Sequence, residues 1–260
     1  MHSLPLGKHN PRIVAIRKAI RTDTLTPDGL LAVEGPKLLE EAVRSHLEVL
    51  DVFVRRGVGL TAVPAGARIF ELDAAMFKAI QSTESSQGII ALVRPPTFSI
   101  RDILSVPNPR IVVLGRLQDP GNVGTIFRVA ESFNATGCIA LAGTAAVYNA
   151  KTVRASAGSV FRLPHVWGAD LNMLNTELKA AGVALVGTSP AAGESIETWD
   201  WKRPTAVLVG NEGAGSSEEE LQQCDVILRV PQNRNVESLN SAIAVAVILY
   251  EASKHERLSV

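Results

Sequence analysis

The chain has 260 residues, of which 46% are hydrophobic and 20% charged, and its 26 basic side chains balance 26 acidic ones. This composition is typical of a folded protein large enough for two domains, and it excludes extensive disorder. No apolar run approaches the roughly 20 residues that cross a bilayer, so no membrane partner is expected. The balanced charge does not exclude a nucleic-acid partner, because phosphate binding needs only a local basic patch.

The N-terminal sequence indicates a cytoplasmic protein. Residues 1–8, MHSLPLGK, lack the apolar core of a signal peptide. Cys138 and Cys224 are interpreted as free thiols in preference to a disulfide. The five histidines show no metal-ligand spacing, and we expect no metal.

Residues 1–95 are predicted to form a small α/β domain. Ile13, Ile16 and Ile20 have helical spacing behind Pro11, which predicts a helix over residues 11–20. Further strands are expected at 30–33, 49–54, 69–72 and 88–93, and further helices at 35–45 and 73–80. Residues 8–21 hold five basic side chains and no acidic one, which indicates either a solvated helix face or a phosphate-binding patch.

Proline-rich sequence then separates two parts of the chain. Arg94-Pro-Pro-Thr-Phe98 is followed by Val106-Pro-Asn-Pro109. Prolines remove hydrogen-bond donors and restrict the preceding residue, so no regular element is expected here. We therefore predict a linker over residues 96–108.

Residues 109–260 are predicted to form a second α/β domain. Strands are expected at 110–114, 138–141, 183–186, 206–209 and 226–230, with helices at 123–133, 150–156, 171–181, 217–222 and 236–255. Short apolar strands that alternate with helices predict a mainly parallel sheet covered on both faces. Ligands are then expected beyond the carboxyl ends of the strands.

The first motif in this half is Asn122-Val-Gly-Thr-Ile-Phe-Arg128, which follows a predicted strand and opens a helix. Asp119-Pro-Gly121 ahead of it predicts a turn, and Asn122 is suited to cap the helix. Arg128 lies less than two helical turns further on. Taken alone, this motif is explained by a helix cap and a surface charge.

The second motif, Gly210-Asn-Glu-Gly-Ala-Gly215, follows the strand predicted at 206–209. Its glycines let a backbone approach a ligand closely. The order GxGxxG is absent and no Gly-Lys-Ser/Thr follows, so a dinucleotide or P-loop site is poorly supported. A simple glycine turn explains the glycines but not the Asn-Glu pair between them.

The third motif begins with Val230-Pro231 at a strand end and continues through a polar loop to Ser238-Leu-Asn-Ser-Ala242. The helix that follows is almost wholly apolar as far as Tyr250. A helix of this kind is expected to be buried inside the domain or against a second subunit. Ser238 is otherwise explained as an N-terminal residue of that helix.

In this order and spacing, the three motifs resemble motifs 1, 2 and 3 of the SpoU (TrmH-like) RNA ribose 2′-O-methyltransferases. The resemblance implies a SPOUT catalytic domain of the α/β class with a C-terminal trefoil knot, assembled as a homodimer. It also implies S-adenosyl-L-methionine (AdoMet) as the methyl donor and RNA as the partner. Residues 33–42 and 87–92 resemble the ribosomal-protein-like, RNA substrate-binding domain that precedes the catalytic domain in many members.

The resemblance implies catalytic roles for five residues. Asn122 would order the active-site loop, and Glu212 would brace the loops or the RNA site. Ser238 and Asn240 match residues near the methyl acceptor. Arg128 is implied to lie near the ribose 2′-hydroxyl and to help remove its proton. Because a guanidinium pKa above about 12 makes the free base rare, Arg128 would also have to hold a phosphate or stabilise the developing alkoxide.

The remaining implied residues contact AdoMet or RNA. Backbone and side chains of the loops would form the cofactor pocket, at Gly210, Asn211, Val230, Leu239 and Thr188. Lys37 and Arg154 match positions that can face RNA, although each is equally explained as a solvated charge.

Ribosomal RNA, and 23S RNA in particular, is the preferred substrate because a ribosomal-protein-like domain precedes the catalytic one. The alternatives are a tRNA methyltransferase, a relative that confers antibiotic resistance, and a non-catalytic RNA-binding or ribosome-assembly protein. A nucleotide-dependent oxidoreductase is disfavoured because its ordered glycine fingerprint is missing.

Overall fold

A computed structural model describes residues 7, 10–60, 64–233 and 235–254 of the chain. Among these residues, those up to Thr97 cluster with Tyr148–Arg162 as one compact unit, called unit 1. Unit 2 contains Phe98–Val147 and the residues from Leu163 onward. Lys8, the first member of the predicted basic cluster, and His255, the predicted end of the last helix, lie outside the described residues.

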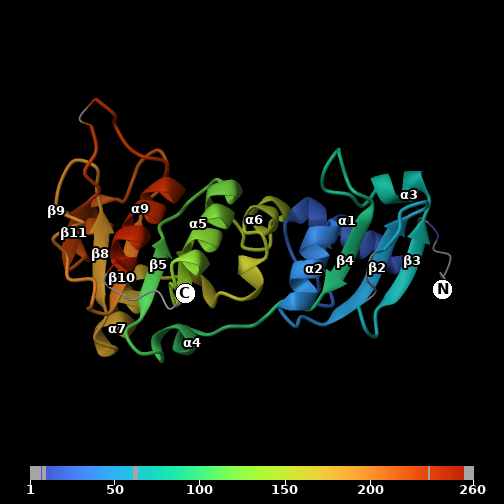
Figure 1. Ribbon diagram of the computed structural model, residues 1–260, viewed down its shortest axis with the longest axis horizontal. Coiled ribbons are helices and arrows are strands. Elements are labelled where there is room, and N and C mark those ends of the chain that lie inside the picture. Colours follow the sequence, from blue (N-terminus) through green and yellow to red (C-terminus); the bar gives the residue numbers. More distant parts are fainter. Residues whose placement is uncertain (1–6, 8–9, 61–63, 234, 255–260) are drawn as a thin grey trace. The chain divides into compact units, whose positions relative to one another are not determined.

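Unit 1 is built on a four-stranded sheet of mixed direction, in the order β1-β4-β2-β3. Figure 1 labels β4, β2 and β3 of this sheet. Its strands are β1 Leu31–Glu34, β2 Val49–Arg55, β3 Arg68–Leu72 and β4 Ile89–Val93, and its first helices are α1 Pro11–Thr22, α2 Pro36–Arg44 and α3 Ala74–Lys78. All seven predicted elements of this region are confirmed, to within two residues at each end. The core includes the stacked rings of Phe53 and Phe70, whose centroids are 5.2 Å apart.

The prediction that the proline-rich linker holds no regular element is wrong. Helix α4, Ile100–Leu104, begins at a capping box in which the Ser99 backbone N–H and hydroxyl both donate to the Asp102 carboxylate at 2.7 Å. Ile103 is fully buried, and a Cβ added to Gly137 would lie 2.7 Å from its Cγ1 atom. Capping and this apolar anchor stabilise a short helix between the two proline pairs.

The segment Tyr148–Arg162 also differs from the predicted division, because it packs with unit 1 although it lies within residues 109–260. It contains helix α6, Ala150–Ala155, which packs against β1, and the 3-10 turn η1, Ser159–Phe161. The Arg162 guanidinium pairs with Glu41 at 2.8 Å. Periodicity predicts that α6 has a buried side but cannot say which sheet it covers.

Unit 2 contains a seven-stranded sheet in the order β7-β6-β5-β10-β8-β11-β9, in which every neighbouring pair is parallel. Its strands are β5 Arg110–Leu114, β6 Gly137–Leu141, β7 His165–Ala169, β8 Ala184–Thr188, β9 Glu194–Ser195, β10 Thr205–Val209 and β11 Val226–Arg229. The predicted parallel α/β sheet is therefore confirmed. The two strands at its edges were not predicted, because β7 is only partly apolar and β9 has two residues.

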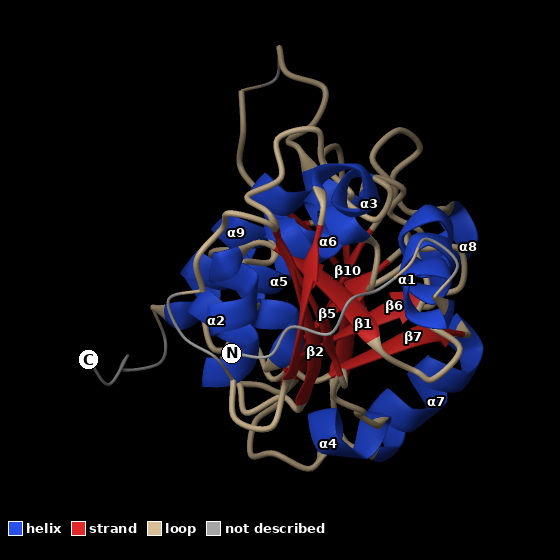
Figure 2. Cartoon of the chain, turned by 90° about the vertical axis from the view of Figure 1, so that its right-hand side faces the viewer, coloured by secondary structure: helices blue, strands red, loops and turns tan. Residues whose placement is uncertain are grey.

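Helices cover both faces of this sheet, with α5 and α9 on one side of β5 and β10, and α7 and α8 on the other (Figure 2). The helices are α5 Pro120–Ser132, α7 Leu171–Ala180, α8 Glu218–Gln222 and α9 Ser241–Ser253. Helix α9 packs against α5. It begins five residues later than predicted, because Asn240 caps it by accepting from the N–H groups of Ala242 and Ile243.

Two general features complete the fold. None of the helices in the described ranges is both long and apolar enough for a bilayer span. Cys138 and Cys224 are free thiols, and burial raises the pKa of Cys224 to about 12, so its thiolate is disfavoured.

Candidate functional site

The three sequence motifs converge because they follow neighbouring strands of the parallel sheet. Strand β10 lies between β5 and β8, with Val209 opposite Leu114, and β11 pairs with the other edge of β8. The chain runs outward from β5 through β6 to β7 and then returns to the other side of β10, so the topological switch point is beside β5 and β10. Loops at such a point form the usual ligand crevice of an open α/β sheet.

A cavity of about 370 Å³ lies at the carboxyl ends of β8, β10 and β11, and we call it the loop cavity. One part of its wall is apolar, with Val209, Leu221, Leu228, Val230, Leu239 and Ile248. The other part is polar, with Thr188, Ser189, Asn211, Glu212, Ser216, Ser238 and Ser241. The volume and the mixed lining are typical of small-molecule sites. All five residues predicted to contact a cofactor line this one cavity.

Two hydroxyl groups in the loop cavity lack the partners that buried polar atoms normally have. The Oγ atoms of Ser216 and Ser241 are buried and have no hydrogen-bond partner among the described residues. A buried polar atom is costly without a partner, so each marks a place where a bound ligand can supply a hydrogen bond. With the adjacent apolar wall, they fit a ligand that combines a flat apolar ring with polar groups, as AdoMet does.

The loop after β10 has a backbone that only a glycine permits at its start. A Cβ on Gly210 would lie 2.1 Å from the Ser216 nitrogen and 2.2 Å from the Gly215 carbonyl carbon. Asn211 closes the turn, because its backbone pairs with that of Gly215 and its Oδ1 accepts from the Gly213 N–H at 3.0 Å. The second motif is therefore a compact turn that folds back on its own first residue.

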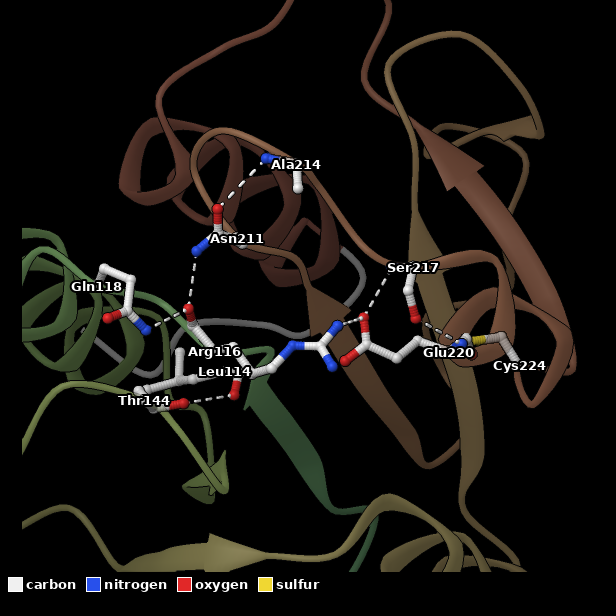
Figure 3. Close-up of polar contacts among 9 residues, drawn as sticks. All are labelled: Leu114, Arg116, Gln118, Thr144, Asn211, Ala214, Ser217, Glu220 and Cys224. Atoms are coloured by element: carbon white, nitrogen blue, oxygen red, sulfur yellow. Dashed lines mark hydrogen bonds and ion pairs between the residues drawn. The ribbon is translucent and has the colours of Figure 1, made fainter.

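Arg116, in the loop after β5, connects this loop to the turn after β10 (Figure 3). Arg116 was not predicted from the sequence. Its carbonyl oxygen accepts from the side chains of Asn211 at 2.9 Å and Gln118 at 3.1 Å. Its guanidinium pairs at 2.9 Å with the buried Glu220, which also completes a capping box with Ser217 at the start of α8. Arg116 adopts a left-handed backbone with φ of 57°, and no sequence pattern signals that conformation.

Glu212 links the second motif to the first. Its carboxylate accepts hydrogen bonds from the backbone N–H groups of Gln118 at 3.1 Å and Asp119 at 3.2 Å, and from Asn122 Nδ2 at 3.1 Å. Burial raises the pKa of Glu212, but these hydrogen bonds favour the charged form more strongly and hold its pKa below the ordinary value. The carboxylate therefore fixes the loop that leads into α5.

Asn122 is not the cap of α5, contrary to prediction. The helix begins at Pro120, and Asp119 is its cap, accepting from the Gly121 N–H at 2.6 Å. The helix starts earlier than expected because proline is well suited to its first position. Asn122 instead uses its side chain to join the motifs, donating to Glu212 and accepting from Asn240 Nδ2 at 3.0 Å.

The other predicted site residues are not part of this hydrogen-bond network. Ser238 lines the loop cavity and is exposed in the loop before α9, so it is not a helix residue. Arg128 is exposed on α5 and does not line the loop cavity. Lys37 and Arg154 belong to unit 1, where Lys37 is exposed in α2 and Arg154 donates to Ser82 Oγ at 2.8 Å.

Family models match both parts of the chain. Residues 109–250 match the SpoU rRNA Methylase family, and residues 10–91 match the MRM3-like substrate binding domain. The first match contains all three motifs, and the second contains Lys37.

Curated relatives are similar over most of the chain. The 23S rRNA (guanosine(2553)-2′-O)-methyltransferase RlmP of Bacillus subtilis is 32% identical over 234 residues, which is 90% of each chain. The 23S rRNA (uridine(2479)-2′-O)-methyltransferase of Streptomyces viridochromogenes is 34% identical over 185 residues, covering 69% of this chain and 64% of that protein.

Solved structures are similar over nearly the whole chain. The SpoU methyltransferase AviRb of Streptomyces viridochromogenes, in complex with AdoMet, superimposes with a TM-score of 0.83 at 28% identity, covering 95% of this chain and 98% of that one. An AdoMet-bound rRNA methyltransferase of Sinorhizobium meliloti has a TM-score of 0.84 at 28% identity and covers 98% of both chains. By its family match, its relatives and its fold, this chain belongs to the SpoU rRNA methylase family.

Proposed function

We propose that this protein transfers a methyl group from AdoMet to a ribose 2′-hydroxyl in RNA, with 23S ribosomal RNA as the preferred substrate. One observation carries the proposal: the lining of the loop cavity suits AdoMet in size and polarity, and it is connected to the other motifs. Glu212 on that lining accepts a hydrogen bond from Asn122, which in turn accepts one from Asn240. The named activities of the relatives support the same reaction. Residues 1–95 would serve as the RNA substrate-binding domain, 96–108 as the linker and 109–260 as the catalytic domain.

The protein's task in this reaction is alignment. When bound, AdoMet supplies a methyl group on a positively charged sulfur. The Glu212 hydrogen bonds hold the loop of the first motif, and the Asn122–Asn240 contact holds the third motif against it. Ser238 and Asn240 are proposed to lie beside the incoming ribose. Fixing these groups before the substrate arrives lowers the entropic part of the barrier.

Binding tests the cofactor assignment directly. Calorimetric titration of the full chain with AdoMet is expected to show one site per chain, whereas titration with NAD is expected to show none. Absence of AdoMet binding would contradict the methyltransferase proposal and favour a non-catalytic RNA-binding protein.

The RNA assignment is tested by methyl transfer to total RNA from cells that lack this protein, followed by mapping of ribose methylation. We expect the methyl group in 23S rRNA, at a nucleotide that is unpaired or can be unstacked, because the 2′-hydroxyl has to reach the cavity. Transfer to tRNA alone would favour the tRNA alternative. Lys37 and Arg154 are proposed to contact this RNA from unit 1.

Replacing Arg128 with lysine is expected to lower methyl transfer about tenfold without changing AdoMet affinity. Lysine keeps a positive charge on the exposed surface of α5 but loses the planar fork that can hold a phosphate or an alkoxide at two points. Single-turnover rates with saturating AdoMet measure the effect. Full activity in this variant would remove both bidentate positioning and a guanidine base from the scheme.

A homodimer is proposed on the exposed apolar side of α9. Ile243 and Tyr250 are 52% and 54% exposed, and they lie seven residues apart with Val247 between them, so the three share one helix face. Large apolar side chains grouped this way usually mark an interface.

The C-terminal trefoil knot implied by the resemblance is proposed for the same part of unit 2.

Exchanging Ile243 for glutamate is expected to convert the dimer to a monomer, because a charge at a buried interface position is not solvated. Sedimentation velocity measures the change. The matched control is Met173→Glu, which places the same charge at a 72% exposed apolar position on α7 and is expected to leave the dimer intact. A monomeric wild-type protein would contradict the homodimer proposal.

Cytoplasmic location, where ribosomal RNA is modified, is proposed together with this function.

A further inference from the structure

Unit 1 contains a second cavity, of about 630 Å³, that the proposed reaction does not use. It lies between the start of α1, the turn before β1, and the ends of the strands of the four-stranded sheet. Three of the residues that line it are arginines, Arg12, Arg68 and Arg94, and we call it the arginine cavity.

A buried carboxylate holds two of these arginines in place. Asp51 on β2 is 1% exposed, and its two oxygens accept from different partners. Arg12 Nε donates to Oδ2 at 3.0 Å, and Arg68 Nε donates to Oδ1 at 2.7 Å. The Arg12 guanidinium also lies over the Phe70 ring, 5.6 Å from its centroid. Asp51 therefore fixes both guanidinium groups at Nε, the nitrogen nearest the side-chain stem.

The terminal nitrogens of both guanidinium groups remain available. Neither Arg12 nor Arg68 makes a further side-chain hydrogen bond within the described part of the chain. Their side chains are 39% and 48% exposed. Two guanidinium forks oriented by one carboxylate are pre-organised donors for an oxyanion, because little rotamer freedom is left to lose on binding.

Neutralising Asp51 does not by itself account for this arrangement. One arginine would balance one buried carboxylate, whereas the Asp51 cluster holds two arginines. The wall also contains Asp28 and Arg94, and Arg94 pairs with the exposed Glu48 at 2.8 Å. With Asp28, Arg94 and Glu48 counted, the charges around the cavity cancel, so its capacity for an oxyanion lies in the two oriented guanidinium groups on Asp51.

We propose that the arginine cavity binds a backbone phosphate of an RNA strand, as a contact point separate from Lys37. The assignment rests on the proposed function in taking RNA as the partner. Leu30, just before β1, lines the cavity, whereas Lys37 follows the other end of that strand, so the two contacts lie at opposite ends of β1. A strand phosphate fits better than a free metabolite, because the donors are exposed at the mouth and not enclosed.

The test measures binding of fluorescein-labelled single-stranded oligouridylate to the full chain by fluorescence anisotropy over a range of salt concentrations. The Arg12→Lys, Arg68→Lys double variant keeps both charges for Asp51 but replaces each planar fork by a single ammonium nitrogen, so the two-point contact with a phosphate is lost. It is expected to bind about tenfold more weakly at an unchanged salt slope, because both positive charges are kept.

A second variant guards against misfolding. Arg12→Gln, Arg68→Gln combined with Asp51→Asn removes the buried charge together with both partners. It is expected to bind at least about tenfold more weakly, with a salt slope smaller by about 0.7, the value for one lost phosphate contact on a single strand. The matched control is Arg56→Gln, which breaks another ion pair of unit 1, with Glu71, outside the cavity. Thermal unfolding establishes that each variant is folded.

The outcomes are distinct. Wild-type affinity in either folded cavity variant, or a wild-type salt slope in the triple variant, would overturn the proposal, whereas loss confined to the cavity variants supports it. Competition by inorganic phosphate at the same concentration as RNA nucleotides would assign the cavity to a free phosphate and overturn the RNA assignment. Calorimetry with AdoMet on the same samples separates the two proposals, because cavity variants are expected to bind AdoMet as the wild type does.

Discussion

Replacing Gly210 with alanine is expected to weaken AdoMet binding more than a hundredfold. The added Cβ would lie 2.1 Å from the Ser216 nitrogen and 2.2 Å from the Gly215 carbonyl carbon, and both are backbone atoms of the same turn. Such a contact cannot be relieved by rotating a side chain, so the turn has to open. Ser216, whose unpartnered hydroxyl lines the loop cavity, would move with it. Isothermal calorimetry with AdoMet measures the loss.

The same turn supplies the control for this prediction. Gly213 also lines the loop cavity, but a Cβ there would meet only Asn211 Oδ1, at an ordinary 3.7 Å. Gly213→Ala is therefore expected to bind AdoMet within about threefold of the wild type. Equal binding by the two variants, either both retained or both lost, would contradict the role given to the backbone at Gly210.

Changing Glu212 to glutamine is expected to lower methyl transfer about a hundredfold while AdoMet affinity falls less than fivefold. The carboxylate accepts two backbone N–H groups and the Asn122 amide, whereas glutamine offers one oxygen and turns a second donor toward them. A donor left without an acceptor costs free energy, and the loop leading into α5 is then released. Misplacing that loop lowers the rate more than it lowers cofactor binding. Steady-state and single-turnover rates, compared with calorimetry, separate the two effects.

The control for Glu212 is Glu237, which lines the same cavity without a side-chain hydrogen bond to another described residue. Glu237→Gln is expected to keep nearly full activity.

The pH dependence of unfolding provides a second measurement on Glu212. Because the folded pKa of Glu212 is depressed, its contribution to stability is complete above the ordinary value of 4.5 and is lost as pH falls through the lower folded pKa. Wild-type protein should therefore keep its stability advantage over Glu212→Gln above pH 4.5 and lose it as the pH falls from there through the folded pKa.

Strands and helices with strong patterns could be predicted from the sequence. Strand β5 has the predicted bounds, 110–114, because a continuous apolar run between prolines and a turn has few alternatives. Strand β7 was missed, since His165 and Gly168 interrupt any apolar run, and its partners in the sheet decide its conformation. Helix α4 was missed because its stability comes from a cap and one buried isoleucine.

The candidate site was predictable in its members but not in its connections. The motifs and their order indicated Gly210, Asn122 and Asn240, and the structure brings their loops together. The ion pair between Arg116 and Glu220 joins residues more than 100 positions apart, and neither belongs to a motif. Similarly, only the fold places Arg12 beside Arg68, because their common partner Asp51 is remote from both in sequence.

The assignment of Tyr148–Arg162 to unit 1 has a consequence for how the molecule can be divided. The chain passes between the two units after Thr97, after Val147 and after Arg162, so no single cut releases either unit whole. A fragment that ends in the proline-rich linker would lack α6 and would expose the surface of β1 that this helix covers. Exchange of RNA specificity between relatives would therefore require grafting two separate stretches of sequence, and a chimera that transfers only the N-terminal stretch is expected to aggregate or remain partly unfolded.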